Sequence, residues 1–244
     1  MFIYHRTKGI VLKKDDRGES DQLFTVYTKD FGRILVLGRA IRKISSKLRA
    51  GIDIFYLSEI EFIQGKAYKT LTDALVIEKF SNIRKNLGKL KITYKIAEIT
   101  DNFLKGEEKD DKLWTLLLDA FRSIDDKELK AKKAKLLLYY YIWHFFSLLG
   151  YEFQLYHCAI CEKKLIAGQL FFNIEAGGII CPKCALESDK AKPIDLNSIK
   201  ILRIISKKDW KTLNRIKIES IDFKSLKNLF ENYLSHLPGE IEAG

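Results

Sequence analysis

The chain has 244 residues, 47% of them hydrophobic, with a formal net charge of +11 and a pI near 9.3. This composition is ample for one large or two smaller folded domains and excludes a chain that is disordered throughout. The longest apolar stretch, residues 136–149, is shorter than the roughly twenty residues that a bilayer span needs, so we expect no transmembrane helix. The first eight residues are too polar for a signal peptide, which favours a cytoplasmic protein. The positive charge favours a polyanionic partner, either nucleic acid or an acidic membrane surface.

The first part of the chain has the composition of strands separated by turns. The predicted strands are residues 8–14, 22–28, 33–38, 52–63 and 68–77. Five strands in about eighty residues predict a small closed barrel. The five-stranded OB-fold is the favoured candidate, because closure removes exposed edges and leaves one groove for an oligonucleotide.

A basic segment without a single carboxylate lies between the third and fourth predicted strands. Its cationic residues are Arg39, Arg42, Lys43, Lys47 and Arg49. We interpret this segment as a phosphate-binding loop, whose affinity for a polyanion would fall with salt. Arg33, Lys13 and Lys14 extend the candidate track along the barrel. The alternative is a solvated loop whose charges only maintain solubility.

The hydrophobic period changes to three and four residues after Glu78, which predicts helices. The predicted helices cover about 90–104, 113–124, 129–149, 197–206, 208–215 and 222–237, and Gly150 is placed to end the third. The expected class is α+β, a barrel followed by a helical domain with an inserted four-cysteine segment. The expected domains are an OB-fold nucleic-acid-binding domain over 1–80, a helical domain over 81–156 and 188–244, and the cysteine segment over 157–187.

All the cysteines of the chain occur as two Cys-x-x-Cys pairs separated by nineteen residues: Cys158 with Cys161, and Cys181 with Cys184. This spacing predicts a zinc site with four thiolate ligands, closed by a hairpin that bends at Gly177-Gly178. A site with four cysteine ligands leaves no open position, so the zinc is expected to be structural. The alternative is a pair of disulfides or a redox role, which a chain without a signal peptide makes less favoured.

Motifs of catalysis are missing, and we expect no enzymatic activity. There is no phosphate-binding P-loop, dinucleotide-binding glycine motif or serine-hydrolase elbow. Asp15, Asp16, Glu19 and Asp21 could bind magnesium in a nuclease, but they flank a glycine-containing turn, where a structural role for aspartate is favoured. His144 lies among aromatic residues and is expected in the core with one hydrogen bond.

Two further groups of residues carry a resemblance to one family. The N-terminal group is Gly9-Ile10-Val11-Leu12, Gly18-Glu19-Ser20-Asp21, Thr28, Gly32, Gly38-Arg39 and Leu71-Thr72-Asp73-Ala74. The later group is Leu148-Leu149-Gly150-Tyr151, His157-Cys158-Ala159-Ile160-Cys161, Phe172, Gly177-Gly178 and Cys181-Pro182-Lys183-Cys184. In this order they resemble the bacterial RecO recombination mediators over nearly the whole chain; residues 84–135 agree in helical character only.

The resemblance implies a nonenzymatic protein of DNA repair and homologous recombination, associated with the nucleoid. It implies binding of single- and double-stranded DNA, annealing of complementary strands, and loading of RecA with RecR onto strands coated by single-stranded DNA-binding protein (SSB). The family's DNA-binding barrel maps onto the basic segment, and a groove in its helical domain receives the acidic tail of SSB. Zinc is implied to stabilise the helical domain. The alternatives are an RNA-binding OB-fold and zinc-ribbon module of translation or transcription, and a metal-dependent nuclease.

Overall fold

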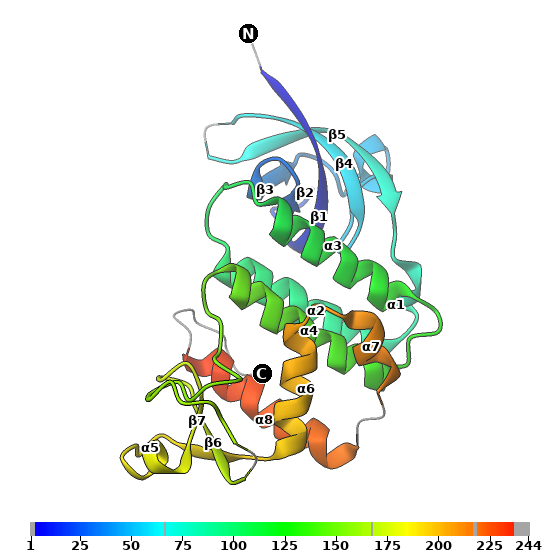
Figure 1. The fold of residues 1–244 in the computed structure, drawn as a ribbon. Coiled ribbons are helices and arrows are strands. Elements are labelled where there is room, and N and C mark those ends of the chain that lie inside the picture. The colour runs from blue at the N-terminus through cyan, green and yellow to red at the C-terminus, as the bar shows by residue number, and fades with distance from the viewer. Residues whose placement is uncertain (1–2, 66, 167, 217–218, 237–244) are drawn as a thin grey trace. The chain divides into compact units, whose positions relative to one another are not determined.

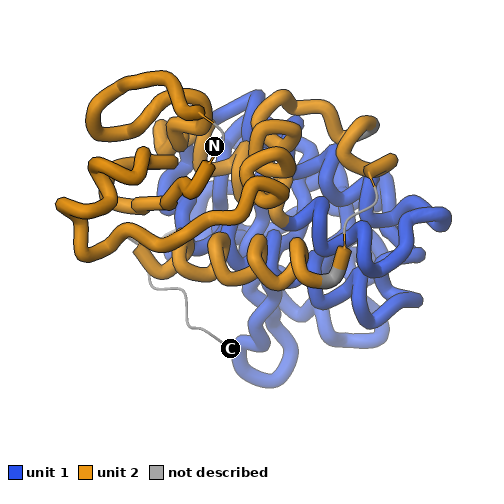
Figure 2. Tube along the Cα trace, turned by 60° about the horizontal axis from the view of Figure 1, so that its bottom comes forward, with its two compact units in different colours: residues 1–138 blue, residues 139–244 orange. Residues whose placement is uncertain are grey.

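The computed structural model describes residues 3–65, 67–166, 168–216 and 219–236. The chain forms two compact units, residues 1–138 and 139–244, each described by itself below (Figure 2). The domain boundaries expected after residues 80, 156 and 187 stay predictions, and residues 237–244 of the last expected domain lie outside the described residues. Across the described ranges, no helix has the length and apolar character needed to cross a membrane.

The first unit begins with a closed five-stranded barrel, as the sequence predicts (Figure 1). Its strands are β1 (Tyr4–Arg17), β2 (Asp21–Thr28), β3 (Gly32–Gly38), β4 (Leu57–Ile63) and β5 (Lys69–Glu78). The strand order is β1-β2-β3-β5-β4, and β4 returns to pair antiparallel with β1. The long first strand serves both neighbours: its first half pairs with β4 and its second half with β2, with a bulge between Val11 and Lys13.

Alternate side chains of the strands fill the barrel, and β3 alternates between buried and half-buried residues along its whole length. The buried cluster consists of Val11, Phe24, Val26, Ile34, Val36, Ile41, Ile52, Ile60, Phe62, Leu71 and Ala74. Ile41 and Ile52 come from the segment between β3 and β4, so this segment is tied to the core at both ends. Phe24 and Tyr27 are buried, so neither ring offers a stacking face to a base.

The fourth predicted strand, residues 52–63, is too long: β4 begins only at Leu57. Phe55 adopts a left-handed conformation with φ of 61°, which a continuous strand does not allow. Its ring points to the helices and packs edge-on against Tyr94 and Phe121, with centroids at 4.7 and 5.8 Å. The apolar residues before Leu57 therefore serve helix packing, which sequence composition does not separate from strand pairing.

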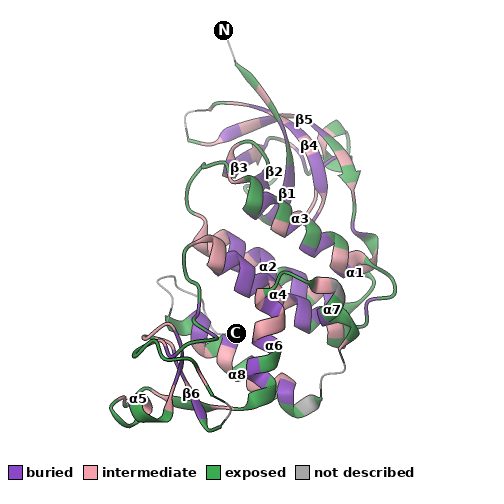
Figure 3. Ribbon diagram, viewed as in Figure 1, coloured by how far each residue is buried: buried purple, intermediate pink, exposed green. Residues whose placement is uncertain are grey.

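The helices of the first unit are α1 (Ser81–Arg84), α2 (Leu87–Phe103), α3 (Asp111–Asp125) and the start of α4 (Ala131–Leu148), after a short 3-10 turn η1 (Lys47–Ala50). Asn86 and Asp110 cap α2 and α3 by accepting hydrogen bonds from backbone N–H groups of the first turn. Figure 3 shows the buried side of α3, which includes Trp114 and Leu117. The acidic run at residues 107–111 lies in the connection from α2 to α3, and its last residue, Asp111, begins α3.

The second unit contains the rest of α4, three short strands and four helices among its described residues. The elements are β6 (Leu170–Asn173), β7 (Gly178–Ile180), α5 (Pro182–Leu186), β8 (Lys192–Ile194), α6 (Leu196–Ser206), α7 (Trp210–Arg215) and α8 (Ser220–His236). The last three helices confirm the sequence prediction, whose final residue, Leu237, lies outside the described residues. Gly150, with φ of 92°, follows the end of α4. Strand β8 is not among the predicted strands.

Aromatic packing holds α4 to α8 in the second unit. Tyr139 stacks on Phe230 with centroids 4.8 Å apart, and Phe146 meets Tyr233 edge-on at 5.3 Å. His144 lies in this core, where its Nε2–H donates to the Ile205 carbonyl at 2.8 Å and its Nδ1 is buried with no hydrogen-bond partner among the described residues. Burial is the main reason that the pKa of His144 falls to about 4, so the ring is neutral at neutral pH. The predicted core role is confirmed.

Candidate nucleic-acid interface and metal site

The basic loop, residues 39–50, follows β3 and presents its five predicted cationic side chains to solvent. It is a series of tight turns: Lys43 N–H donates to the Ala40 carbonyl at 3.1 Å, and Ser46 N–H donates to the Lys43 carbonyl at 3.0 Å. Ala40 takes a left-handed conformation with φ of 50°. These turns place Arg39, Arg42 and Lys43 close together on the surface of the barrel.

The turn between β1 and β2 anchors this loop. The Asp21 carboxylate accepts from the Ala40 N–H at 2.7 Å, and the Ser20 carbonyl accepts from the Arg42 N–H at 2.9 Å. Sequence reasoning missed this role, because an aspartate beside a glycine turn is common whatever it bonds. The signal that identifies it is the hairpin register, in which Gln22 pairs with Gly38 and brings Asp21 beside the start of the loop.

Two other acidic residues near this turn, Asp15 and Asp16, also pair with neighbouring side chains. Asp15 lies 3.3 Å from Lys13, and Asp16 lies 3.2 Å from Arg42 and accepts from Gln22 at 2.8 Å. Among the described residues, only the four cysteines form a group of three or more histidine, cysteine or acidic side chains close enough to hold a metal ion. The carboxylates are therefore placed for the structural role that the sequence favours, not gathered as magnesium ligands.

A pocket of about 370 Å³ lies beside the basic loop. It is lined by Lys14, Gln22, Ile41, Arg42, Arg49, Ile52 and Asp53. Two loop arginines, Arg42 and Arg49, thus share one hollow with Lys14 of β1. We call this hollow the basic pocket.

Asp53 is held at the edge of the basic pocket by two cations. Lys14 Nζ donates to its Oδ1 at 2.5 Å, and the Arg84 guanidinium lies 3.4 Å from its Oδ2. The Ile54 N–H adds a bond of 2.8 Å. Burial acts to raise the pKa of Asp53, but these hydrogen bonds and the charges of Lys14 and Arg84 outweigh it and hold the pKa below its usual value. Asp53 is therefore ionised at neutral pH.

Arg33 differs from the loop cations in place and in partner. It lies at the start of β3, whereas the loop follows the end of that strand. Its Nε donates to Asp101 of α2 at 2.6 Å, and about a fifth of each side chain is exposed. The structure thus keeps Arg33 apart from the basic loop; the nucleic-acid role of all six predicted residues stays a prediction.

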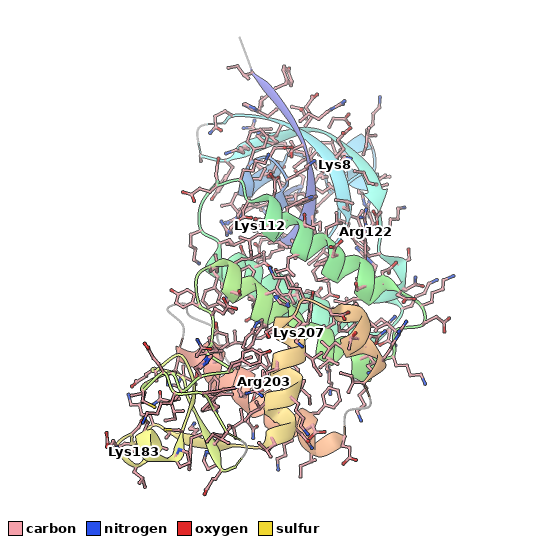
Figure 4. All side chains as sticks on the ribbon, in the orientation of Figure 1. Lys8, Lys112, Arg122, Lys183, Arg203 and Lys207 are labelled. Carbon is pink, nitrogen blue, oxygen red and sulfur yellow. The ribbon has the colours of Figure 1, made fainter. Side chains whose placement is uncertain are left out.

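Several basic residues outside the loop have partners of their own, among them Arg122 and Arg203, which are labelled in Figure 4. Arg122 of α3 pairs with Glu78 at the end of β5. Arg203 of α6 donates twice to the Leu155 carbonyl, at 3.1 and 2.7 Å, and lies over the Tyr156 ring. These side chains therefore hold elements together within their units.

The cysteines of the two Cys-x-x-Cys pairs come together in the second unit. Their four sulfur atoms lie within 4.8 Å of one another, and the Cys161 and Cys181 sulfurs are 3.9 Å apart. This separation is close to the ~3.8 Å between neighbouring ligands of a tetrahedral ion with bonds of ~2.3 Å. Cys158 and Cys184 are buried, whereas Cys161 is exposed. The four sulfurs are placed to hold a metal ion.

Local structure explains how the cysteines converge. Strands β6 and β7 form the predicted hairpin, and Cys181 follows β7 and precedes the first turn of α5, where Pro182 is well tolerated. The hairpin turn comprises residues 174–177, and at Gly178, the first residue of β7, a Cβ atom would lie 2.4 Å from the Gln154 carbonyl oxygen. The first pair is held against the same hairpin, because Ala159 N–H donates to the Ile179 carbonyl at 2.9 Å.

The charge of the cluster also suits a cation. Burial acts to raise the pKa of Cys158, but N–H groups of Cys161, Cys181 and Ile160 directed at its sulfur lower it to about 6. Burial, together with bonds and charge from the other sulfurs, raises the pKa of Cys184 to about 12 in the metal-free cluster. A cluster of four thiolates is therefore stable only with a cation between them.

Comparisons with protein families agree with this division of the chain into a barrel and a later region. A family model described as "Recombination protein O N terminal" matches residues 1–80. A second, described as "Recombination protein O C terminal", matches residues 84–240. The first match covers the barrel, and the second includes the cysteine cluster.

Individual relatives give the same result. A protein of Dehalococcoides mccartyi named "DNA repair protein RecO" is 32% identical over 213 residues, which cover 87% of this chain and 82% of the relative. Proteins of the same name from Roseiflexus sp. and Thermoanaerobacter sp. are 28% and 26% identical, over 96% and 98% of this chain and over 81% and 94% of their own lengths. The similarity therefore extends through both units.

Proposed function

The chain belongs to the RecO family of DNA repair and recombination proteins, and we propose that it is a nonenzymatic mediator that binds single- and double-stranded DNA and anneals complementary strands. The observation that carries this proposal is the basic loop, an exposed cluster of cations on a closed barrel, held in one conformation by Asp21 and Ser20. The formal net charge of +11 supports it. Annealing at such a surface involves no bond making or breaking by the protein, so no catalytic residue is assigned.

The physical basis of the activity is charge neutralisation. Two DNA strands repel each other through their phosphates, and a surface rich in arginine and lysine lowers this repulsion without reading base sequence. The basic loop presents Arg39, Lys43 and Lys47 with no carboxylate of its own between them. Binding is therefore expected to tolerate any sequence and to weaken steeply with salt.

We assign zinc to the cysteine cluster. Cys158, Cys161, Cys181 and Cys184 would hold the ion, and the sulfur-only ligand set with its near-tetrahedral spacing fits Zn²⁺. The ion would neutralise the thiolates and join the first cysteine pair to the hairpin and α5. Its role is structural, because all four positions are taken by the protein.

In the proposed pathway this chain acts in the cytoplasm at the nucleoid, with RecR, to load RecA onto SSB-coated strands. An acidic SSB tail suits a protein of this charge. A pocket of about 640 Å³ in the second unit is a poor match for such a tail, because Glu175, Asp189, Asp195 and Glu231 line it beside Lys190 and Lys192. We therefore assign no residues to the SSB contact.

The test is the annealing rate of two complementary oligonucleotides coated with SSB from the same source, in EDTA and without ATP. Acceleration by this protein is the expected result, and it also excludes a magnesium-dependent nuclease or an ATPase as the cause. No acceleration, together with tight binding of RNA in preference to DNA, would replace the proposal by an RNA-binding module. The RNA arm uses the same oligonucleotide sequences.

A further inference from the structure

The basic pocket differs from the exposed part of the basic loop, because two of its three cations, Lys14 and Arg42, are already paired with carboxylates. Lys14 is bonded to Asp53, and Arg42 is 3.2 Å from Asp16. The two carboxylates come from outside the loop, Asp16 from β1 and Asp53 from the segment before β4. The pocket thus combines three cations with one carboxylate in its own lining, Asp53, and Asp16 adds a second carboxylate paired to its Arg42.

We propose that the basic pocket binds one phosphate group of the nucleic-acid backbone, between Lys14, Arg42 and Arg49, and that Asp16 and Asp53 act as internal counterions which this phosphate displaces. The inference rests on the proposed DNA binding and goes beyond it, since it names a phosphate site and two acidic residues that weaken it. The pocket volume of about 370 Å³ leaves room for a sugar beside the phosphate.

Asp53 has a second partner to which it can turn when Lys14 is engaged by a phosphate. Arg84 lies 3.4 Å from its Oδ2, outside the lining of the basic pocket. The Arg84 guanidinium is fixed, because it also donates to the Ile54 carbonyl and lies 4.8 Å from the centroid of the Tyr56 ring. Displacement from Lys14 therefore leaves Asp53 paired with Arg84, which lowers the cost of opening the site.

Asp16 also keeps a hydrogen-bond partner when its cation is taken by a phosphate. Its Oδ2 faces Arg42 while its Oδ1 accepts from Gln22 Nε2 at 2.8 Å, and about half of the side chain is exposed. When a phosphate takes the arginine, Asp16 keeps its bond to Gln22 and its contact with water. Both aspartates thus give up an ion pair on DNA binding without becoming buried and unpaired.

Displacement of the two aspartates should change how the affinity for DNA depends on salt concentration. A cation that exchanges a carboxylate for a phosphate neutralises less net DNA charge than a free cation does. The wild-type protein should therefore show a shallower dependence of binding on salt than its number of phosphate contacts implies. Removing one internal counterion should tighten binding and steepen that dependence.

The experiment measures fluorescence anisotropy of a labelled oligo(dT) at several salt concentrations with the full chain. Asp53→Asn keeps an acceptor for the Ile54 N–H and removes the charge; Glu59→Gln is the matched control, because Glu59 lies on β4 of the same barrel, is paired to Arg6 and does not line the basic pocket. We expect Asp53→Asn to bind about fivefold tighter in low salt, with a log–log salt slope steeper by up to about one, and Glu59→Gln to change affinity by less than about twofold.

Equal effects of Asp53→Asn and Glu59→Gln would overturn the inference, since both would then report only the general electrostatic field of the barrel, while the proposed DNA binding would stand. Failure of the wild-type protein to bind the oligonucleotide at low salt would overturn both this inference and the proposed DNA binding. If Asp53→Asn does not fold, Asp16→Asn carries the test, because the Asp16 carboxylate bonds to the side chains of Arg42 and Gln22 and an asparagine retains the acceptor for Gln22. Asp16→Asn is then expected to bind the oligonucleotide about fivefold tighter than the wild-type protein in low salt.

Discussion

The Asp21 carboxylate accepts a hydrogen bond of 2.7 Å from the backbone N–H of Ala40, the second residue after β3. Ala40 is in a left-handed conformation that a residue with a Cβ atom rarely adopts, so this bond stabilises an unfavourable backbone state. The position of the cations that follow Ala40 thus depends on a residue of opposite charge.

Comparing Asp21→Ala with Asp21→Asn separates the role of Asp21 as an anchor of the basic loop from the effect of its negative charge. Loss of a negative charge beside the basic loop favours DNA binding, whereas loss of the anchor disorders the loop and disfavours it. We expect the second effect to win, with affinity for a single-stranded oligonucleotide falling by roughly tenfold, since a hydrogen bond to a charged group contributes about 1.5 kcal/mol. Asp21→Asn removes the same charge but keeps an acceptor and should bind within about twofold of wild type. Tighter binding by both variants in anisotropy titrations would show that loop order is unimportant.

Charge reversal in the loop tests whether it binds DNA. Arg39→Glu with Lys43→Glu should weaken binding and reduce the salt slope by about 0.9 for each phosphate that the protein no longer neutralises on duplex DNA, and by about 0.7 on single strands. Lys127→Glu with Lys130→Glu changes the net charge of the chain equally, at exposed positions before α4, and is the control. An unchanged slope in the loop variant, or an equal change in the control, would remove the loop from the DNA-binding surface.

The cysteine cluster is tested by metal content and stability together. Cys158→Ser should release the bound zinc, measured by mass spectrometry of the metal, and lower the unfolding temperature by at least about 5 °C, because structural metal binding contributes directly to folding. His157→Ala is the matched control: it is the exposed neighbour of Cys158 and is not in the cluster. Loss of zinc in the control, or full stability of the metal-free cysteine variant, would contradict the assignment.

His144 should make the free energy of unfolding fall as pH is lowered. Its pKa is about 4 in the folded chain, below the ~6.5 of an unfolded histidine, so the unfolded state takes up the proton first. The stability associated with the neutral ring is complete above about pH 6.5 and is lost as pH falls from there toward 4, by roughly 3 kcal/mol in all. His144→Gln, which can still donate to the Ile205 carbonyl, should show a flatter decline in urea unfolding over this range. Equal slopes for the two proteins would show that this ring does not titrate as expected.

The sequence predicted the elements that are determined by residues close together in the chain. Alternating apolar residues identified four of the five strands of the barrel to within a few residues at each end. The Cys-x-x-Cys pairs identified the four side chains whose sulfurs come together, because each pair is a single turn of chain. The extent of β4 was wrong, since Phe55 packs on helices α2 and α3 and not along a strand. Composition alone does not say which neighbour an apolar residue meets.

The parts of the site that sequence reasoning missed depend on contacts between distant residues. Asp21 meets Ala40 because of the register between β2 and β3, and Asp53 meets Lys14 across 39 positions of the chain. Neither aspartate stands out from others in turns. Strand β8 was missed for a similar reason: with Pro193 in a three-residue strand, it is defined by its pairing to β6 more than by its own composition.

The barrel has all its strands by Glu78, whereas the cysteine cluster is complete only at Cys184. At about 5–20 residues per second, the ribosome needs roughly 5–20 s to synthesise the intervening chain. A barrel that closes β4 onto β1 needs nothing from the second unit to satisfy its edges. The proposed DNA-binding surface is thus expected to exist on the nascent chain before the cysteines to which we assign zinc have been made, so zinc shortage would leave proteins with a formed barrel and an unfinished second unit.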